Sequence, residues 1–243
     1  MKILKRIFYI VLVVILISVM LVSITMFLKD KKQDKEEQEV FEDLITIIEN
    51  NDDTNREDNE DYSTLFEQNQ DMIAWIKIED TNINYPVMQT KDRPNYYLKK
   101  NFYKEYSYYG TPYMQENCDI DLSDNLIIYG HHIKNSSMFG VLEKYKNKEF
   151  YNDHKEINFI TKGEVNRYEI VYTFKTSATR GFEYYKYIDF NNESEFNTFN
   201  TKCKELAFFD TNISSNYGDK YITLSTCDYT MKNGRFVVIA KKI

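Results

Sequence analysis

An uncharged run of 22 residues, from Ile7 to Leu28, constrains this chain more than any other feature. The run is rich in Val, Ile, Leu and Met, and at about 1.5 Å per residue a helix of this length crosses the roughly 30 Å hydrocarbon core of a bilayer. A secretory signal peptide has a shorter apolar region, about 7–15 residues, followed by an A-x-A-like cleavage site. The first alanine of this chain is Ala74, so that site is missing. The run therefore predicts an uncleaved transmembrane anchor.

Three basic residues, Lys2, Lys5 and Arg6, stand before the run. Short segments rich in Lys and Arg stay on the cytoplasmic side of a membrane. The sequence thus predicts a single-pass protein of the cell membrane whose N-terminus is cytoplasmic. Everything after Lys29 is expected to lie outside the cell.

The net charge of -7 is distributed unevenly over the 243 residues. Residues 1–28 carry +3, residues 29–61 carry -9, and residues 62–243 carry only -1. The near-neutral C-terminal part gives no electrostatic reason to expect a nucleic-acid partner. We therefore predict a basic stub with an anchor (1–28), an acidic helical neck and linker (29–61), and a folded domain (62–243).

The neck divides into a helix and a linker. Between Lys29 and Asn50 apolar residues recur at helical spacing among acidic ones, which predicts an amphipathic helix. Its apolar stripe is expected to pack on the following domain, with a partner-binding coil as the alternative. Residues 50–61 contain no apolar side chain and cannot offset the entropy cost of ordering, so they are predicted to be a linker.

The folded domain is mainly β by its pattern. Runs of alternating, β-branched or aromatic residues separated by turn residues predict strands, and their irregular spacing favours a barrel or a sandwich. The main helical interruption is 193–209, where the apolar residues fall on one face. The predicted strands are Ala74–Ile78, Ile83–Met88, Asn125–Gly130, Arg167–Thr176, Tyr221–Cys227 and Arg235–Lys242. The eight aromatic residues between Tyr96 and Tyr113 are expected to serve packing rather than ligand binding.

Three cysteines and three histidines limit the search for a nucleophile and its base. Cys227 ends a predicted strand, where a side chain is held by the sheet yet open to a substrate. His131 and His132 follow another strand and a glycine, Gly130, that lets the backbone turn. Histidine exchanges protons near neutral pH, but strand geometry alone does not separate this adjacent pair.

Arg235 opens the last predicted strand, eight residues after Cys227. A short loop of this length would fold it back beside the sulfur, where a permanent cation can stabilise a developing oxyanion. The other two cysteines, Cys118 and Cys203, lack an evident activating partner. The dispersed His and Cys residues show no metal-ligand spacing, so no metal or other cofactor is expected, and an odd cysteine count leaves a free thiol.

Three of these segments together resemble the sortases, the membrane-anchored cysteine transpeptidases of Gram-positive bacteria. They are TLSTC (Thr223–Cys227), RFVVIA after it, and IIYGHH (Ile127–His132) before it, and the likeness extends over roughly Trp75 to Ile243. Class B is the best subdivision, because His131 and Cys227 are 96 residues apart and the connection contains the predicted helix. The helical neck points the same way.

The resemblance implies an eight-stranded β-barrel with N-terminal helices and a helix before the strand that carries the cysteine, so that residues 62–243 form a catalytic domain. It implies that Cys227 attacks the Thr carbonyl of a C-terminal sorting signal similar to NPxTN, giving a thioacyl enzyme. His131, which directly follows the glycine, would protonate the leaving amine, and Arg235 would hold the oxyanion. Ser225 would line the substrate groove.

The partners implied are surface proteins that bear this signal, and peptidoglycan or its lipid-linked precursor as the amine acceptor. A class D-like or pilin-polymerising sortase is one alternative, and a cysteine peptidase that releases its substrate to water is another. From a different class, the chain could be a non-catalytic membrane-tethered surface module with an inert barrel.

Overall fold

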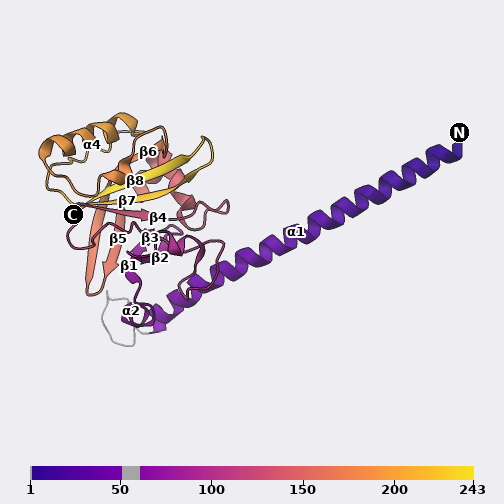
Figure 1. Cartoon of the computed structure of the whole chain (residues 1–243), viewed down its shortest axis with the longest axis horizontal. Helices are drawn as coiled ribbons and strands as arrows, with labels where there is room; N and C mark the ends of the chain where they lie inside the picture. Colours follow the sequence, from indigo (N-terminus) through magenta and orange to yellow (C-terminus); the bar gives the residue numbers. More distant parts are fainter. Residues whose placement is uncertain (1, 51–60) are drawn as a thin grey trace. The chain divides into compact units, whose positions relative to one another are not determined.

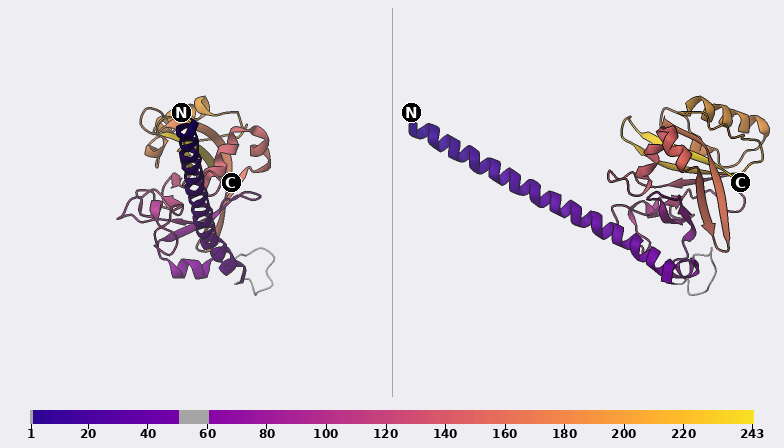
Figure 2. Two further views of the ribbon diagram at one scale, coloured as in Figure 1. Left: turned by 90° about the vertical axis from the view of Figure 1, so that its right-hand side faces the viewer. Right: turned by 180° about the vertical axis from the view of Figure 1, so that it is seen from behind.

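A computed structural model of the chain describes residues 2–50 and 61–243. The chain divides into two compact units, Met1–Ile45 and Thr46–Ile243. Helix α1 (Lys2–Asn50) is unbroken in every view (Figures 1 and 2). The large apolar side chains between Ile7 and Leu28 are all exposed. In the described part of the chain, α1 is the one helix whose length and composition suit a membrane crossing.

Ten residues of the predicted linker, 51–60, lie outside the described residues. The boundaries of the three predicted parts stay a prediction. Helix α2 (Ser63–Gln68) is the first element after the linker. The carboxylate of Asp61 accepts a hydrogen bond from the Ser63 amide at 2.8 Å just before the helix, whose N-cap residue, Tyr62, makes no side-chain capping bond.

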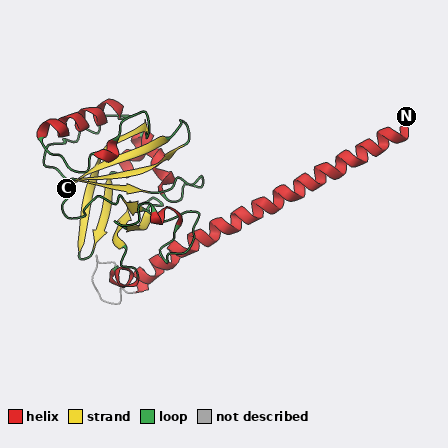
Figure 3. Ribbon diagram, viewed as in Figure 1, coloured by secondary structure: helices red, strands yellow, loops and turns green. Residues whose placement is uncertain are grey.

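Eight strands close into a barrel in the order β1-β2-β3-β4-β7-β8-β6-β5. Neighbouring strands are antiparallel except for β2–β3 and β4–β7, which are parallel. The prediction of an eight-stranded barrel is therefore confirmed (Figure 3). The strands are β1 (Met72–Lys77), β2 (Asn84–Met88), β3 (Tyr113–Met114), β4 (Asn125–Tyr129), β5 (Glu156–Thr161), β6 (Glu164–Ser177), β7 (Tyr221–Asp228) and β8 (Gly234–Lys242).

Helical segments occupy the connections between the strands (Figure 1). The 3₁₀ helices are η1 (Tyr96–Lys99), η2 (Phe139–Lys146) and η3 (Tyr184–Lys186), and the α-helices are α3 (Lys148–Asp153) and α4 (Glu193–Leu206). Of these, η2 follows β4, and η3 and α4 lie in the long connection between β6 and β7.

Helix α4 is the predicted helix before the cysteine strand. Asn192 caps its first turn, because its side-chain oxygen accepts a hydrogen bond from the Glu195 amide at 3.0 Å. Phe196 and Phe199 are buried on the expected apolar face. The helix ends at Leu206 rather than at residue 209, because the Phe208 amide donates to the Thr173 carbonyl of β6 at 3.0 Å.

The eight aromatic residues between 96 and 113 differ in exposure. Tyr97, Phe102, Tyr109 and Tyr113 are buried, as a packing role predicts. Tyr96 is half-buried, and Tyr103, Tyr106 and Tyr108 are exposed. The packing prediction is therefore wrong for these three rings, because their segment runs over the surface outside the strands.

The turn after β4 requires a glycine at position 130 because there is no room for a side chain, and not because the backbone adopts a positive φ. Gly130 is not among the residues with positive φ. A Cβ placed on it would lie 2.6 Å from Cγ of Phe139, whose ring is fully buried at the start of η2. The Phe139 amide also donates to the His131 carbonyl at 2.9 Å. The missing side chain thus lets η2 pack directly against the end of β4.

We expect Gly130→Ala to lower the free energy of unfolding by about 1–3 kcal/mol, because the added methyl group overpacks a rigid site. The measurement is urea unfolding of the purified chain. The matched control is a double-mutant cycle with Phe139→Leu, in which the smaller side chain should recover part of the loss. Strictly additive losses would contradict this assignment.

Candidate active site

The ends of three neighbouring strands, β4, β7 and β8, bring the predicted site residues together. In the parallel pairing of β4 with β7, Tyr129 lies opposite Ser225. In the antiparallel pairing of β7 with β8, Cys227 lies opposite Arg235. Side chains directly opposite each other in such a pair have Cβ atoms about 4.5–5.5 Å apart. The loop after Cys227 therefore folds Arg235 back beside the sulfur, as its length predicts.

The three cysteines differ in exposure. Cys118 and Cys203 are buried, whereas Cys227 is partly exposed. Burial raises the pKa of the Cys118 thiol to about 11, and it raises the pKa of Cys203 well above its usual range. A thiolate is the reactive form of cysteine, so both buried residues are poor nucleophiles. Cys227 is the cysteine that a substrate can reach.

Arg235 is only partly exposed, and its guanidinium donates a hydrogen bond to the Gly234 carbonyl at 2.9 Å. Among the described residues it makes no ion pair. The nearest carboxylate along β7, that of Asp228, lies on the other face of the strand and pairs with Lys175. The remaining donors of Arg235 are therefore not committed to a carboxylate of the described chain.

The imidazole of His131 is held by a carbonyl group. Its Nε2 lies 2.8 Å from the Leu98 oxygen, which can only accept, so Nε2 carries the proton. Burial lowers the pKa of His131, the positive charge of Lys99 lowers it further, and the hydrogen bond to Leu98 opposes both. Within residues 61–243 the structure shows no hydrogen bond from His131 to Cys227 or Arg235. The other ring nitrogen, Nδ1, is the one that can exchange a proton.

His132 points to a different partner. Its Nδ1 lies 2.9 Å from the carbonyl oxygen of Cys227, and its Nε2 lies 3.9 Å from a carboxylate oxygen of Glu143. Consecutive residues of an extended chain point to opposite sides, which separates the two adjacent imidazoles. His131 and His132 are therefore held by different parts of the barrel, a distinction that the sequence pattern does not contain.

Ser225 is buried, and its hydroxyl group shares a hydrogen bond of 2.5 Å with the Tyr184 phenol. Burial raises the pKa of Tyr184 to about 12, so the phenol stays protonated at neutral pH. Tyr184 lines a pocket of about 400 Å³ beside Arg235, and Ser225 is not among the lining residues. The predicted role of Ser225 in the groove stays a prediction. The pocket is lined by Asn95, Tyr113, Gln115, Glu116, Tyr129, Ala178, Tyr184, Tyr185 and Arg235.

Thr226 also contributes to the site. The Thr226 hydroxyl donates to the Gly130 carbonyl at 2.8 Å, which ties β7 to the turn that carries both histidines. A larger open hollow of about 1340 Å³ lies beside α4, and none of the predicted site residues lines it.

In the described residues no group of three or more His, Cys, Asp or Glu side chains is arranged to hold a metal ion. Thr226 and Tyr184 were not identified from the sequence, since a lone Thr or Tyr carries no spacing signal.

We expect the free energy of unfolding to depend less on pH in His131→Gln than in the wild-type chain, which tests the environment of His131. Because the pKa of His131 is lower in the folded chain, the unfolded chain takes up the proton first as the pH falls below about 7. This group therefore lowers the free energy of unfolding on acidification. Gln retains a donor near Nε2 for the Leu98 carbonyl but does not titrate.

The measurement is urea unfolding at about pH 7.5 and about pH 5.5, either side of the usual histidine pKa. The wild-type chain should lose more stability between the two values than His131→Gln does. Equal losses would mean that His131 is not held in its neutral form.

Comparison with known proteins places these features in context. The profile of the sortase domain family matches residues 76–243. Sortase B of Staphylococcus aureus is 32% identical over 185 residues, which is 75% of this chain and 74% of that protein. Sortase B of Listeria monocytogenes is 33% identical over 192 residues, or 78% and 76% of the two chains. A solved structure described as a Staphylococcus aureus sortase B–substrate complex has a TM-score of 0.74 and 29% identity, and the match covers 89% of this chain and 98% of that one.

Proposed function

The chain belongs to the sortase family, class B, and we propose that it is a membrane-anchored transpeptidase in which Cys227, His131 and Arg235 carry the reaction. The family is one of cysteine transpeptidases that anchor proteins to the cell wall. The observation that supports the assignment of residues most is the Cys227–Arg235 cross-strand pair. It sets the one cysteine that is not buried opposite a guanidinium without an ion pair in the described residues.

In the first half-reaction, the Cys227 thiolate attacks the carbonyl carbon of a Thr in the substrate, with the thiol proton held on His131. Negative charge develops on the carbonyl oxygen, and the guanidinium of Arg235 stabilises it by hydrogen bonds and charge. His131 then gives its proton to the leaving amine, and the peptide bond breaks. The product is a thioacyl enzyme with a neutral imidazole. Nδ1 acts in these transfers, because Nε2 is bonded to the Leu98 carbonyl.

In the second half-reaction, an incoming amine attacks the thioacyl carbon. His131 removes the amine proton, Arg235 again holds the oxyanion, and the Cys227 thiolate leaves. A new amide bond joins the substrate to the amine, and the enzyme returns to its starting state. The lowered pKa of His131 favours the neutral imidazole that this step requires.

The substrate is a surface protein with a C-terminal sorting signal similar to NPxTN, cleaved after Thr. The pocket beside Arg235 supports this proposal, because its tyrosine and amide groups can hydrogen-bond an extended peptide next to Cys227. The solved Staphylococcus aureus relative is described as a substrate complex, which supports a bound substrate in this branch of the family. The acceptor is an amine of peptidoglycan or of its lipid-linked precursor.

The apolar part of α1 anchors the enzyme in the cell membrane. Its exposed apolar side chains from Ile7 to Leu28 support this proposal, and the basic residues before them favour a cytoplasmic N-terminus. The barrel then lies outside the cell, where both surface proteins and peptidoglycan are found.

To test the nucleophile, the detergent-solubilised full chain is incubated with a fluorogenic NPxTN-like peptide and analysed by mass spectrometry. We expect the acyl adduct on Cys227, and a loss of about 10³-fold or more in kcat for Cys227→Ala, since the covalent step has no substitute. Cys118→Ala is the matched control and should retain the adduct.

An added short peptidoglycan mimic with a free amine should raise product formation. Labelling at Cys118 or Cys203 alone would overturn the assignment of the nucleophile. A rate that does not respond to the amine would identify a hydrolase instead.

Arg235 is tested by its charge and its geometry. Arg235→Ala should lower kcat/KM about 10²- to 10³-fold, the usual cost of losing an oxyanion donor. Arg235→Lys should recover part of this loss, because it restores the charge but not the planar fork. Arg167→Ala is the control, since Arg167 lies on β6 opposite Asn158, away from the Thr176–Arg235 end of that strand. A change of less than about threefold in Arg235→Ala would contradict the role, because even a single hydrogen bond that involves a charged group contributes more.

A further inference from the structure

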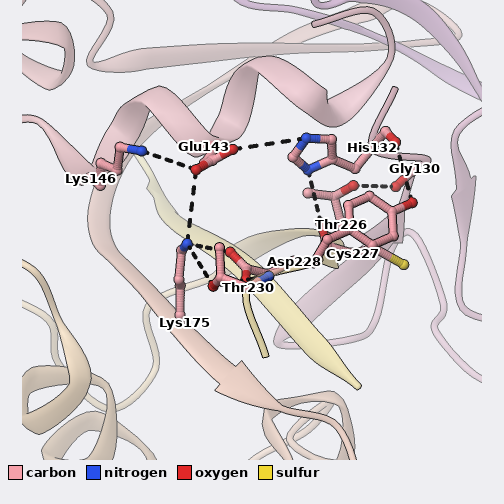
Figure 4. Close-up of polar contacts among 10 residues, drawn as sticks. Gly130, His132, Glu143, Lys146, Lys175, Thr226, Cys227, Asp228 and Thr230 are labelled. Atoms are coloured by element: carbon pink, nitrogen blue, oxygen red, sulfur yellow. Dashed lines mark hydrogen bonds and ion pairs between the residues drawn. The ribbon is translucent and has the colours of Figure 1, made fainter. Parts of the chain in front are cut away.

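A connected group of charged and polar side chains lies behind the cysteine strand. We call it the Glu143 network, and Figure 4 shows that Glu143 lies between His132 on one side and two lysines on the other. Its members come from the turn after β4, from η2, from β6, from the end of β7 and from the turn that follows β7. They are His132, Glu143, Lys146, Lys175, Asp228 and Thr230.

The first arm of the network reaches the backbone of the cysteine itself. The Cys227 carbonyl oxygen can only accept, so Nδ1 of His132 donates the 2.9 Å hydrogen bond between them. Nε2 faces Glu143 at 3.9 Å, and the ring meets Tyr229 edge to face with centroids 5.4 Å apart. The His132 side chain is only 14% exposed. Its imidazole is therefore held from three sides.

The second arm reaches the residue that follows the cysteine. Asp228 is 2% exposed and forms an ion pair with Lys175. Its carboxylate also accepts hydrogen bonds from the amide of Thr230, at 2.8 Å, and from the Thr230 hydroxyl. Burial alone would raise the pKa of Asp228, but the hydrogen bonds from Lys175 and Thr230 outweigh it, and the pKa is lowered. Asp228 is thus a charged anchor inside the barrel wall.

The two arms together clamp one peptide group. The carbonyl that His132 binds belongs to the peptide bond between Cys227 and Asp228, and Lys175 holds the side chain of Asp228. Glu143 joins the arms, because it faces both His132 and Lys175 at 3.9 Å. Asp228 is the last residue of β7 that pairs with β8, so this peptide group lies at the end of the strand. Backbone hydrogen bonds break most readily at strand ends. A clamp at this point fixes the backbone from which the sulfur projects.

We propose that His132 is a positioning residue, which holds the Cys227–Asp228 peptide group through its Nδ1 hydrogen bond and so keeps the sulfur aligned with Arg235 and the substrate. The inference rests on the proposed function, in which Cys227 is the nucleophile. Misplacement of a reacting group by about 1 Å can reduce a rate about 10²-fold, so loss of the clamp should appear in kcat rather than in KM.

Two substitutions distinguish the roles of the two ring nitrogen atoms of His132. The amide nitrogen of Asn lies near the position of Nδ1, and that of Gln lies near the position of Nε2. His132→Asn should therefore keep the hydrogen bond to the Cys227 carbonyl and lose the approach to Glu143. His132→Gln should do the reverse. If the clamp acts as proposed, Asn recovers most of the function that Gln loses.

Two readouts are measured on the detergent-solubilised full chain. The first is kcat and KM with the NPxTN-like peptide, where His132→Gln should lose about 10-fold or more in kcat with little change in KM, and His132→Asn should retain at least about a third of kcat. The second is hydrogen exchange of the peptide that contains residues 224–231, which should become at least about fivefold faster in His132→Gln alone. His154→Gln is the matched control, because Nδ1 of His154 also bonds a carbonyl, that of Phe150 at 2.8 Å, within a different element.

Equal losses of kcat in His132→Asn and His132→Gln would overturn the proposal, as would unchanged exchange at residues 224–231 in His132→Gln. If the wild-type chain forms no adduct on Cys227, the proposed function fails instead, and the exchange measurement still reports whether His132 holds the strand end. If His132 were the general base, both variants would lose the acyl transfer and neither would change the exchange. The three outcomes are therefore distinct.

Discussion

The register of three adjacent strands, β4, β7 and β8, is the constraint on which the rest of the site depends. Because side chains alternate between the two faces of a strand, a shift of one residue between β7 and β8 would turn Cys227 and Arg235 away from each other. The parallel pairing of β4 with β7 likewise sets the height of the turn that carries His131 and His132. The closed barrel leaves no free edge along which these strands could slip. The arrangement of the proposed catalytic residues is therefore a consequence of strand pairing, with the loops completing it.

The barrel wall contains a buried ion pair at a place where apolar side chains could also pack, and burying apolar side chains costs less free energy than burying charges. Removing ions from water is unfavourable, and a buried pair often stabilises a protein no more than well-packed apolar side chains of the same volume. The Lys175–Asp228 pair, with Asp228 only 2% exposed, therefore has a poor explanation in stability alone. It does fix one backbone arrangement, since an apolar pair has no direction and could not hold the Cys227–Asp228 peptide group at a set angle. The network is better explained by the position it gives to the cysteine.

The sequence identified the elements that carry a strong periodic signal, and it missed those whose form depends on distant contacts. Six strands, α4 and the closed barrel were predictable, and so was the approach of Arg235 to Cys227, because each follows from local pattern, loop length or family resemblance. Strand β3 has only two residues, too few for alternation, and β5 was overlooked although Ile157 and Phe159 alternate with polar residues. The end of α4 and the close approach of Phe139 to Gly130 depend on residues far away in the sequence. For the same reason the partners of Ser225 and His132 could not be foreseen.

The Glu143 network and Arg235 lie on opposite faces of the strands. Asp228 lies opposite Gly234 and Cys227 lies opposite Arg235, and because successive side chains alternate between faces, the Asp228 carboxylate points away from the face that carries Arg235. Lys175 pairs with that carboxylate on the same far face, and Arg235 makes no ion pair in the described residues. An arginine already paired with a carboxylate would have to break that pair before it could stabilise an oxyanion, and the cost would appear in the barrier. The alternation of side chains thus gives the anchoring ion pair and the proposed oxyanion donor separate faces, so the strand end that carries the proposed nucleophile is anchored without committing Arg235.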